Sequence, residues 1–221
     1  MNLQLEGKRA LVTGSTAGTG FAIAQVLASE GASVIVNGRT PQRVEDALKK
    51  LKASRAEPQG LAADLGTAAG AHEAITRFPE VEILVNNHGI FERNRLNRSP
   101  RRIGYISFEV NVLSGVRLSR YYLPLTKRRN WGRIVFTLSQ SAVQIPSGMI
   151  HYGMTKTAQV AVSRGLAETT VGTDVTVDAV LAGPTASEGV KNFVQQVAAN
   201  QKTDAATVEK SSSAACGRLP S

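Results

Sequence analysis

Short apolar runs alternate with longer amphipathic stretches along most of this chain. Each run is rich in Val, Ile and Leu and is bounded by turn residues, a pattern typical of buried β-strands. The clear runs span 9–14, 33–38, 82–87, 133–139 and 175–183, with a weaker one at 58–64. The sequence therefore predicts six strands that carry little polar surface.

The stretches between these runs have apolar residues at helical spacing. They span 19–31, 41–53, 67–78, 101–129 and 152–170. Thr40 and Pro41 form a start signal, because threonine is a good N-cap and proline is favoured at the first helical position. Strands that are apolar throughout and alternate with helices predict a parallel sheet covered on both faces.

Two segments interrupt the pattern. Five arginines crowd together between 93 and 102, where the helical spacing is poor. Near the C-terminus, a helix-like stretch at 189–201 is followed by residues without periodicity. We therefore expect one α/β domain over 1–203 and an irregular tail over 204–221.

Composition narrows the class of protein. The chain has 221 residues, of which 42% are hydrophobic, and this is enough to bury one sizeable core. Neither a secretory signal nor a run of about 18 apolar residues occurs, which predicts a cytoplasmic protein that does not enter a membrane. Cys216 is the only cysteine, so an intrachain disulfide is excluded. Three histidines without suitably spaced acids predict no metal site.

The formal net charge of +9 arises in one segment. Residues 93–133 hold eleven Lys or Arg and one acid, Glu109, so the rest of the chain sums to −1. A basic segment can be a solvated face or a phosphate-binding patch. Because no nucleic-acid-binding module and no alternation of basic with aromatic residues accompanies it, the sequence disfavours a nucleic-acid partner.

A glycine-rich turn follows the first run directly and opens the first helix. Gly14, Gly18 and Gly20 lie in the stretch TGSTAGTG at 13–20. Glycines there allow a tight turn and the close approach of a pyrophosphate, whose charge a helix N-terminus favours. A turn without a ligand is the alternative, but the strand before it and the helix after it favour a dinucleotide site.

The end of the second run bears on the choice of dinucleotide. Gly38 and Arg39 stand where an acid would bind the ribose 2′-hydroxyl of NAD. We expect NADP(H) to be preferred, with NAD(H) possible, because a guanidinium binds a 2′-phosphate that no carboxylate repels. Arg39 could instead stack on adenine. Asp64 could accept a hydrogen bond from the adenine amino group or cap a helix.

Tyr152 and Lys156 lie four positions apart, on one face of a predicted helix. Together with the glycine turn, Asp64-Leu65, NNHG at 86–89, Asn111 and Ser139, this pair resembles the short-chain dehydrogenase/reductase family, in particular its 3-oxoacyl-ACP reductase-like members. The resemblance runs from about residue 5 to about residue 200. It implies a single doubly wound Rossmann domain with a mostly parallel sheet.

The resemblance also implies an NAD(P)(H)-dependent enzyme that interconverts a carbonyl and an alcohol on a small molecule. Tyr152 would be the acid/base, and Lys156 would lower its pKa. Ser139 would orient the substrate, and Asn111 would help hold a water, although a buried asparagine can instead bridge backbone. The implied cofactor-binding positions are Gly14, Ser15, Thr16, Gly18, Thr19, Gly20, Arg39, Asp64, Leu65, Asn87, Gly89, Tyr152, Lys156, Gly183 and Thr185.

The chain also departs from the family pattern. Members usually continue through a seventh strand, so we expect a sheet truncated at its C-terminal end, with an exposed edge. His88 replaces a usual alanine and His151 precedes Tyr152; both are interpreted as local polar contacts. A catalytically weak or inactive dinucleotide-binding protein is therefore the alternative function.

Association is expected to be limited to a weak homodimer. The long helices at 101–129 and 152–171 would form its interface. Their apolar candidates for this contact are Val112, Val116, Val160 and Val162.

Overall fold

The computed structural model describes residues 3–51, 57–92 and 101–183, together with single positions between 194 and 208. The chain divides into one compact unit over Met1–Ala182 and a second over Gly183–Ser221, and each is described by itself. In the second unit, Val194, Ala198 and Val208 form a small buried cluster. The helix expected at 189–201 lies largely outside the described residues, and the domain boundary after residue 203 stays a prediction.

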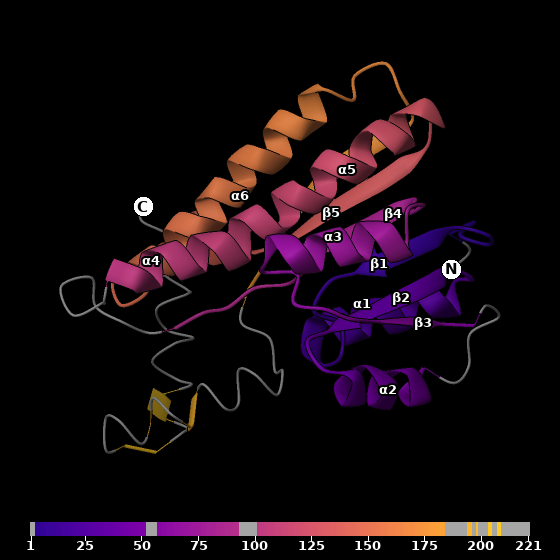
Figure 1. The fold of residues 1–221 in the computed structure, drawn as a ribbon. Coiled ribbons are helices and arrows are strands. Elements are labelled where there is room, and N and C mark those ends of the chain that lie inside the picture. Colours follow the sequence, from indigo (N-terminus) through magenta and orange to yellow (C-terminus); the bar gives the residue numbers. More distant parts are fainter. Residues whose placement is uncertain are drawn as a thin grey trace. The chain divides into compact units, whose positions relative to one another are not determined.

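Six parallel strands form one sheet in the order β3-β2-β1-β4-β5-β6 (Figure 1). Their bounds are β1 (Arg9–Val12), β2 (Ser33–Gly38), β3 (Gln59–Ala62), β4 (Ile83–Asn86), β5 (Gly132–Ser139) and β6 (Val175–Ala182). The chain adds β2 and β3 on one side of β1 and then crosses over to add β4, β5 and β6 on the other. This is a doubly wound sheet, which confirms the predicted fold class and all six predicted strands.

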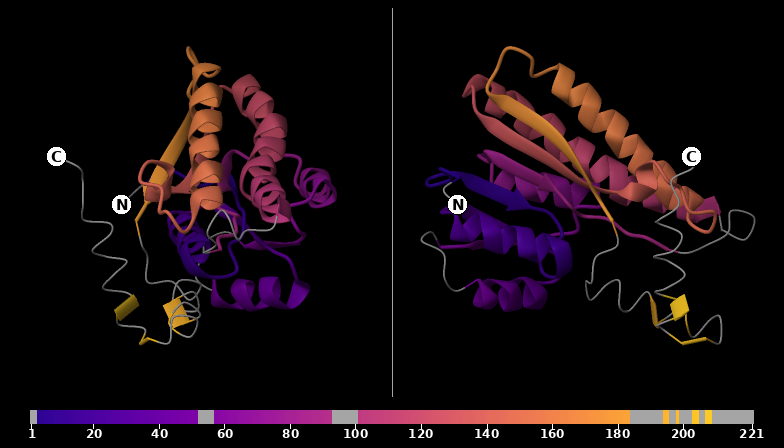
Figure 2. Two further views of the ribbon diagram at one scale, coloured as in Figure 1. Left: turned by 90° about the vertical axis from the view of Figure 1, so that its left-hand side faces the viewer. Right: turned by 180° about the vertical axis from the view of Figure 1, so that it is seen from behind.

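Helices cover both faces of the sheet, as the views from three sides show (Figures 1 and 2). Helices α1 and α2 pack on one face, and α3, α5 and α6 pack on the other. Their bounds are α1 (Gly18–Ser29), α2 (Pro41–Lys50), α3 (Ala68–Arg77), α4 (Arg101–Phe108), α5 (Ser114–Arg128) and α6 (Ile150–Glu168). Thr40 caps α2 and Pro41 is its first residue, as the start signal predicts.

The long helix predicted over 101–129 is interrupted. A π-helical turn, η2 (Glu109–Leu113), separates α4 from α5. Its central residue, Asn111, is fully buried and binds the backbone of Ile90 on the neighbouring loop. Periodicity could not show this turn, because the hydrogen bonds to Ile90 join segments distant in sequence. Such turns occur often at functional sites.

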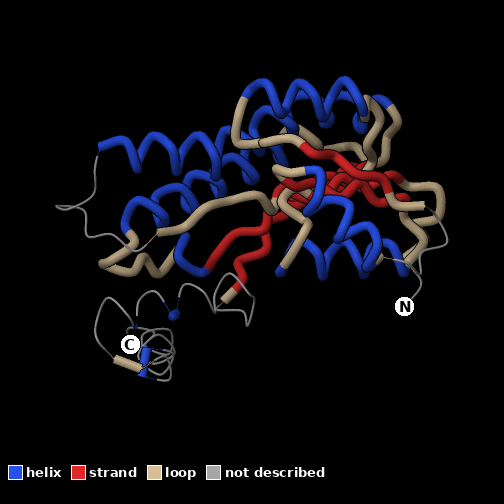
Figure 3. The backbone as a smooth tube through the Cα atoms, turned by 60° about the horizontal axis from the view of Figure 1, so that its bottom comes forward, coloured by secondary structure: helices blue, strands red, loops and turns tan. Residues whose placement is uncertain are grey.

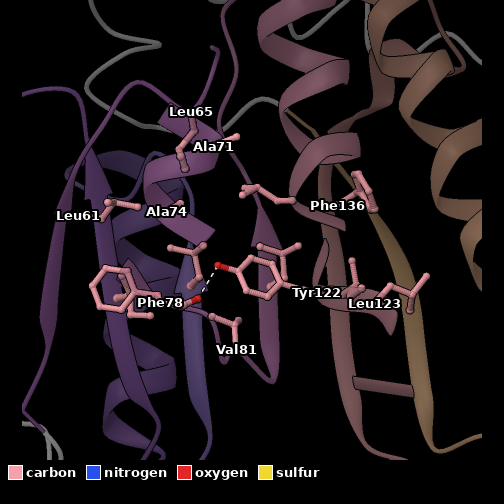
Figure 4. Close-up of a cluster of buried hydrophobic side chains, with 14 of the residues drawn as sticks. Leu61, Leu65, Ala71, Ala74, Phe78, Val81, Tyr122, Leu123 and Phe136 are labelled. Carbon is pink, nitrogen blue, oxygen red and sulfur yellow. Dashed lines mark hydrogen bonds between the residues drawn. The ribbon is translucent and has the colours of Figure 1, made fainter. Parts of the chain in front are cut away.

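The core consists of two clusters, one on each face of the sheet. The larger one packs β-strand side chains against α3 and α5 (Figure 4). Tyr122 is fully buried there, and its hydroxyl donates to the Phe78 carbonyl at 2.8 Å. The smaller cluster joins the other face to α1 and α2 through small residues such as Ala24 and Ala28. Small side chains allow α1 to lie close to the sheet, directly after the turn that opens it.

The parallel register brings the carboxyl ends of the strands to one edge of the sheet. Figure 3 shows the strands, in red, lying between blue helices. Val12 of β1 pairs with Val36 of β2 and with Val85 of β4. One step further, Asn86 of β4 pairs with Phe136 of β5. The strand order reverses between β1 and β4, and ligands of open α/β sheets bind at this point of reversal.

Candidate active site

The hydroxyl of Thr13 ties together the two strand ends that flank the point of reversal. It donates to the Val85 carbonyl at 3.2 Å and accepts from the backbone N–H groups of Asn87 and His88, both at 2.8 Å. The Asn87 side chain in turn donates to the carbonyls of Thr13 (3.0 Å) and Gly14 (3.2 Å). The loop after β4 is therefore fixed against the glycine turn after β1.

The glycine turn has the shape of an anion cradle. Gly14 and Gly18 have φ values of +62° and +59°, a region that favours glycine. A Cβ on Gly20 would lie 2.5 Å from both the Gly14 carbonyl and Asn87 Nδ2. Helix α1 starts without a side-chain cap, since Ala17 stands at the N-cap position. Its first N–H groups are thus open to a phosphate, with Thr19 in the same turn.

Buried hydrogen bonds of Ser15 and Asn37 hold the glycine turn in place. Ser15 Oγ donates to the Val12 carbonyl at 2.6 Å and accepts from the Asn37 N–H at 2.9 Å, so the hydroxyl predicted to bind cofactor is engaged within the fold. Asn37 Oδ1 accepts from the Gly14 N–H at 3.0 Å, and its Nδ2 donates to the carbonyls of Leu61 and Ala63. Asn37 is a positioning residue that the sequence analysis missed; its signal is one polar side chain ending an apolar run.

The predicted adenosine side lies across the ends of β2 and β3. A Cβ on Gly38 would lie 2.4 Å from Thr16 Cγ2, so glycine is needed for Thr16 to pack there. Arg39 follows and is exposed. Leu65 is fully buried and packs in the core cluster against α3, so its side chain has a structural role.

Asp64 does not cap a helix, so that alternative is wrong. Thr67 is the N-cap of α3 and accepts from the Gly70 N–H at 3.0 Å. The carboxylate of Asp64 accepts from the Gly66 N–H at 3.0 Å and is half exposed. It therefore stabilises the turn after β3 while part of it stays open to solvent.

Ser139, Tyr152 and Lys156 meet at the end of β5. Ser139 is the last residue of that strand; its Oγ accepts from the Ser141 N–H at 3.1 Å, and its side chain hydrogen-bonds with Tyr152. Lys156 Nζ lies 5.7 Å from the Tyr152 ring centroid and donates to the Thr137 carbonyl at 3.2 Å. The lysine is buried, and the Thr137 carbonyl is its one hydrogen-bond acceptor among the described residues.

Burial controls the proton affinities of this group. It raises the pKa of Tyr152, and the hydrogen bond with Ser139 opposes this only in part. Burial also lowers the pKa of Lys156 to about 8. The expectation that Lys156 lowers the pKa of Tyr152 is thus not met in this structure, because desolvation of the phenol outweighs the influence of its neighbours.

Asn111 links the loop after β4 to α6. Its Oδ1 accepts from the Ile90 N–H at 2.7 Å, and its Nδ2 donates to the Ile90 carbonyl (2.9 Å) and to Thr155 Oγ1 (3.0 Å). A Cβ on Gly89 would lie 3.2 Å from Asn111 Oδ1 and 3.8 Å from Lys156 Nζ. Asn111 does bridge backbone, therefore, and Gly89 leaves space between it and the lysine.

Four further residues were predicted for the site or lie beside it in sequence or space. Gly183 belongs to the second unit, and Thr185 lies outside the described residues. His151 is buried, and within the described ranges neither of its ring nitrogens has a hydrogen-bond partner. Phe91, which the sequence analysis did not single out, meets the Tyr152 ring edge-on with the centroids 6.2 Å apart.

Comparison with known proteins agrees with this geometry. A family model described as short chain dehydrogenase matches residues 8–198. The chain belongs to the short-chain dehydrogenase family. The uncharacterized oxidoreductase YvaG of Bacillus subtilis (strain 168) is 46% identical to it over 199 residues, which cover 89% of this chain and 75% of the relative.

Two further similarities concern members with named activities. The 3-oxoacyl-[acyl-carrier-protein] reductase FabG of Escherichia coli (strain K12) is 31% identical over 188 residues, covering 82% of this chain and 75% of the relative. The crystal structure of L-sorbose reductase from Gluconobacter frateurii, complexed with NADPH and L-sorbose, matches with a TM-score of 0.86 at 26% identity, covering 94% of this chain and 81% of that one. The predicted family and an NAD(P)-dependent oxidoreductase of this family are thereby confirmed.

The fit of a dinucleotide to the fold rests on two observations. The glycine turn excludes side chains where a pyrophosphate would approach, and Gly89 leaves room beside Lys156.

In the part of the chain that the structure describes, no helix is long and apolar enough to span a membrane. A cytoplasmic location stays a prediction.

Proposed function

We propose that this protein is an NADP(H)-preferring oxidoreductase that interconverts a carbonyl and an alcohol, with Tyr152 as the acid/base. The observation that carries the proposal is the hydrogen bond between Ser139 and Tyr152, formed beside buried Lys156 at the edge that also holds the glycine turn. A nicotinamide dinucleotide bound there supplies the hydride.

Ser139 and Tyr152 act as a pair of hydroxyl groups toward one substrate oxygen. A carbonyl oxygen that accepts from both is fixed in position, and charge that develops on it is stabilised. Because the pKa of Tyr152 is raised, its hydroxyl keeps its proton at neutral pH and is ready to donate it in the direction of reduction. In the reverse direction, the phenolate accepts the alcohol proton.

Lys156 favours the charge that Tyr152 acquires in reduction. With a pKa of about 8, most of its amine is protonated at neutral pH, so an ammonium group faces the phenolate as it forms. The hydrogen bond to the Thr137 carbonyl holds the amine in place. Asn111 fixes the helix face behind it through Thr155, one residue before the lysine.

The preference for NADP(H) rests on the end of β2. Arg39 is exposed there, and Gly38 offers no carboxylate that would repel a 2′-phosphate. The NADPH bound by the sorbose reductase supports the same cofactor in this chain. The small-molecule substrate carries a carbonyl or hydroxyl group; the named relatives suggest a ketose and a 3-oxoacyl thioester as first compounds to test.

Tyr152→Phe tests the proposal directly. Oxidation of NADPH is followed with a panel of carbonyl compounds, and binding of NADPH is measured separately by fluorescence. We expect the variant to lose turnover but to bind NADPH as the parent does, since only the proton donor is removed. Tyr105→Phe, at an exposed site on α4, is the matched control and keeps full activity.

Two results would count against this assignment in different ways. Parental turnover in the Tyr152→Phe variant would show that Tyr152 is not the acid/base. A parent that binds NADPH but reduces nothing on a broad panel would favour the alternative, a dinucleotide-binding protein with weak or absent activity.

A further inference from the structure

His88 lies between the glycine turn and the turn after β3. Its backbone N–H donates to Thr13 Oγ1, which fixes it directly after β4. A Cβ on Gly14 would lie 3.2 Å from its Cα and 3.4 Å from its Nδ1, so the ring rests against the first glycine of the turn. On the other side, its Nε2 is 4.0 Å from Asp64 Oδ1. The imidazole thus spans the two turns that flank the proposed adenosine site.

Charged groups from three elements act on this ring. They are Asp64 from the turn after β3, Arg39 from the end of β2 and Lys156 from α6. Burial comes first and lowers the pKa of His88; Asp64 raises it, while Arg39 and Lys156 lower it further. Burial, the largest of these influences, favours the neutral imidazole, and 15% of its side chain remains exposed at this edge.

A bound 2′-phosphate would change this balance. A phosphate monoester carries a charge of about −1.5 to −2 at pH 7. Placed against Arg39, it would offset the cation that opposes protonation of His88. Arg39 follows Gly38, whose carbonyl accepts from the Ala63 N–H at 2.9 Å, so the phosphate would lie at the strand end next to the one that carries Asp64. NAD(H) lacks that phosphate and leaves the local balance nearer to that of the free protein.

We propose that His88 takes up a proton when the 2′-phosphate of NADP(H) binds beside Arg39, so that the preference for NADP(H) over NAD(H) strengthens as the pH falls. This inference rests on the proposed dinucleotide function. Protonated His88 would then be a second cation beside Arg39, and it would form only when the phosphorylated cofactor is bound.

The sign of the effect separates it from titration of the phosphate itself. Free 2′-phosphate has a second pKa of about 6, and Arg39 favours its dianion, so this group releases protons on binding. His88 binds a proton in the same step. The two contributions are opposite, and a variant without the imidazole retains only the first.

The test measures binding of NADP⁺ and of NAD⁺ by titration calorimetry at about pH 6, 7 and 8, in two buffers with different ionisation enthalpies. The parent is compared with His88→Ala and with His88→Gln, which keeps a polar side chain of similar length. His72→Ala is the matched control, since His72 is exposed on α3.

We expect the ratio of the NAD⁺ and NADP⁺ dissociation constants to rise several-fold from pH 8 to pH 6 in the parent. Each unit by which the bound phosphate raises the pKa of His88 strengthens binding up to about tenfold at low pH. Both His88 variants, which retain only the proton release of the phosphate, should show a ratio that no longer rises toward pH 6 and no proton uptake with NADP⁺. The His72 variant should match the parent.

Equal pH dependence and equal proton uptake in the parent and both His88 variants would overturn the inference while leaving the proposed function standing. A parent that binds neither dinucleotide would instead contradict the proposed function. Because NAD⁺ binding also reports whether each variant is folded, a variant that has lost its structure is recognised, and the other one decides.

Discussion

Replacing Lys156 by Met should make the protein more stable at neutral pH. The amine is buried and its pKa falls from the usual 10.5 to about 8 on folding, with burial as the cause. At about 1.4 kcal/mol per pKa unit, keeping the charged form in the folded protein costs about 3 kcal/mol. Methionine fills a similar volume without a charge, so this cost disappears in the variant.

The pH dependence of the difference has a defined sign. Between pH 8 and 10.5 the unfolded chain binds a proton at this position that the folded chain has lost, so the free energy of unfolding of the parent rises with pH. The variant has no such group. Its advantage should therefore be full below pH 8 and should fall by about 2–3 kcal/mol between pH 7 and pH 10.

Urea unfolding at several pH values measures this difference. The fluorescence of Trp131, the single tryptophan, reports unfolding, because the ring contacts Lys8 and Arg133 in the folded state. Subtracting the variant curve from the parent curve removes the titration of all other groups. A constant loss of packing, or of the bond to Thr137, shifts the whole difference but does not change its slope.

Lys49→Met is the control of opposite sign. Lys49 is exposed, and its hydrogen bond with Glu45 raises its pKa. Its contribution is present below the unfolded pKa of 10.5 and is lost only as pH rises through the folded value, so this variant should be slightly less stable across the whole range. If the Lys156→Met difference showed no slope between pH 7 and pH 10, the buried amine would not titrate as we have argued.

Three further outcomes can be checked with single variants. Asn111→Ala should lose about 2 kcal/mol more stability by urea unfolding than Asn86→Ala. Within the described residues, the Asn111 side chain makes three hydrogen bonds and that of Asn86 makes one, to Ser119, at similar burial. Equal losses would contradict this. Arg39→Asp should shift the ratio of kcat/KM values from NADP(H) toward NAD(H), and an unchanged ratio would remove Arg39 from the site. Light scattering should give at most a dimer for the parent and a monomer for Tyr105→Glu, with no change for Val171→Glu; a stable tetramer would refute the predicted assembly.

The sequence predicted the sheet well, because β1, β2 and β4 are buried along most of their length and are therefore rich in apolar residues. β4, for example, is buried at every position and begins with three apolar residues, Ile83, Leu84 and Val85. The glycine turn after β1 could also be predicted, because Gly14 and Gly18 have positive φ values that favour glycine. Both features depend on residues that are close together in sequence.

Features set by distant contacts were predicted less well. The π-helical turn at Asn111 depends on Ile90, and the position of Asn37 depends on Leu61 and Ala63. The proposed dimer surface stays a prediction, but one of its four valines cannot take part, because Val112 is buried within its own fold. Val116, Val160 and Val162 are partly buried, and Tyr105 on the same stretch of helices is 80% exposed.

Burial raises the pKa of Tyr152 and lowers the pKa of Lys156. Both shifts mark a part of the fold where ionisable groups lower the stability of the protein. Lys156 is buried and Tyr152 is partly buried at the carboxyl edge, and Asn86 Oδ1, near the same edge, is buried without a partner among the described residues. A chain selected only for stability would place apolar residues at these positions. If the edge is an active site, the Lys156→Met variant must gain stability and lose turnover together. A gain in stability with unchanged turnover would mean that the buried amine has no part in the chemistry, whatever family the chain belongs to.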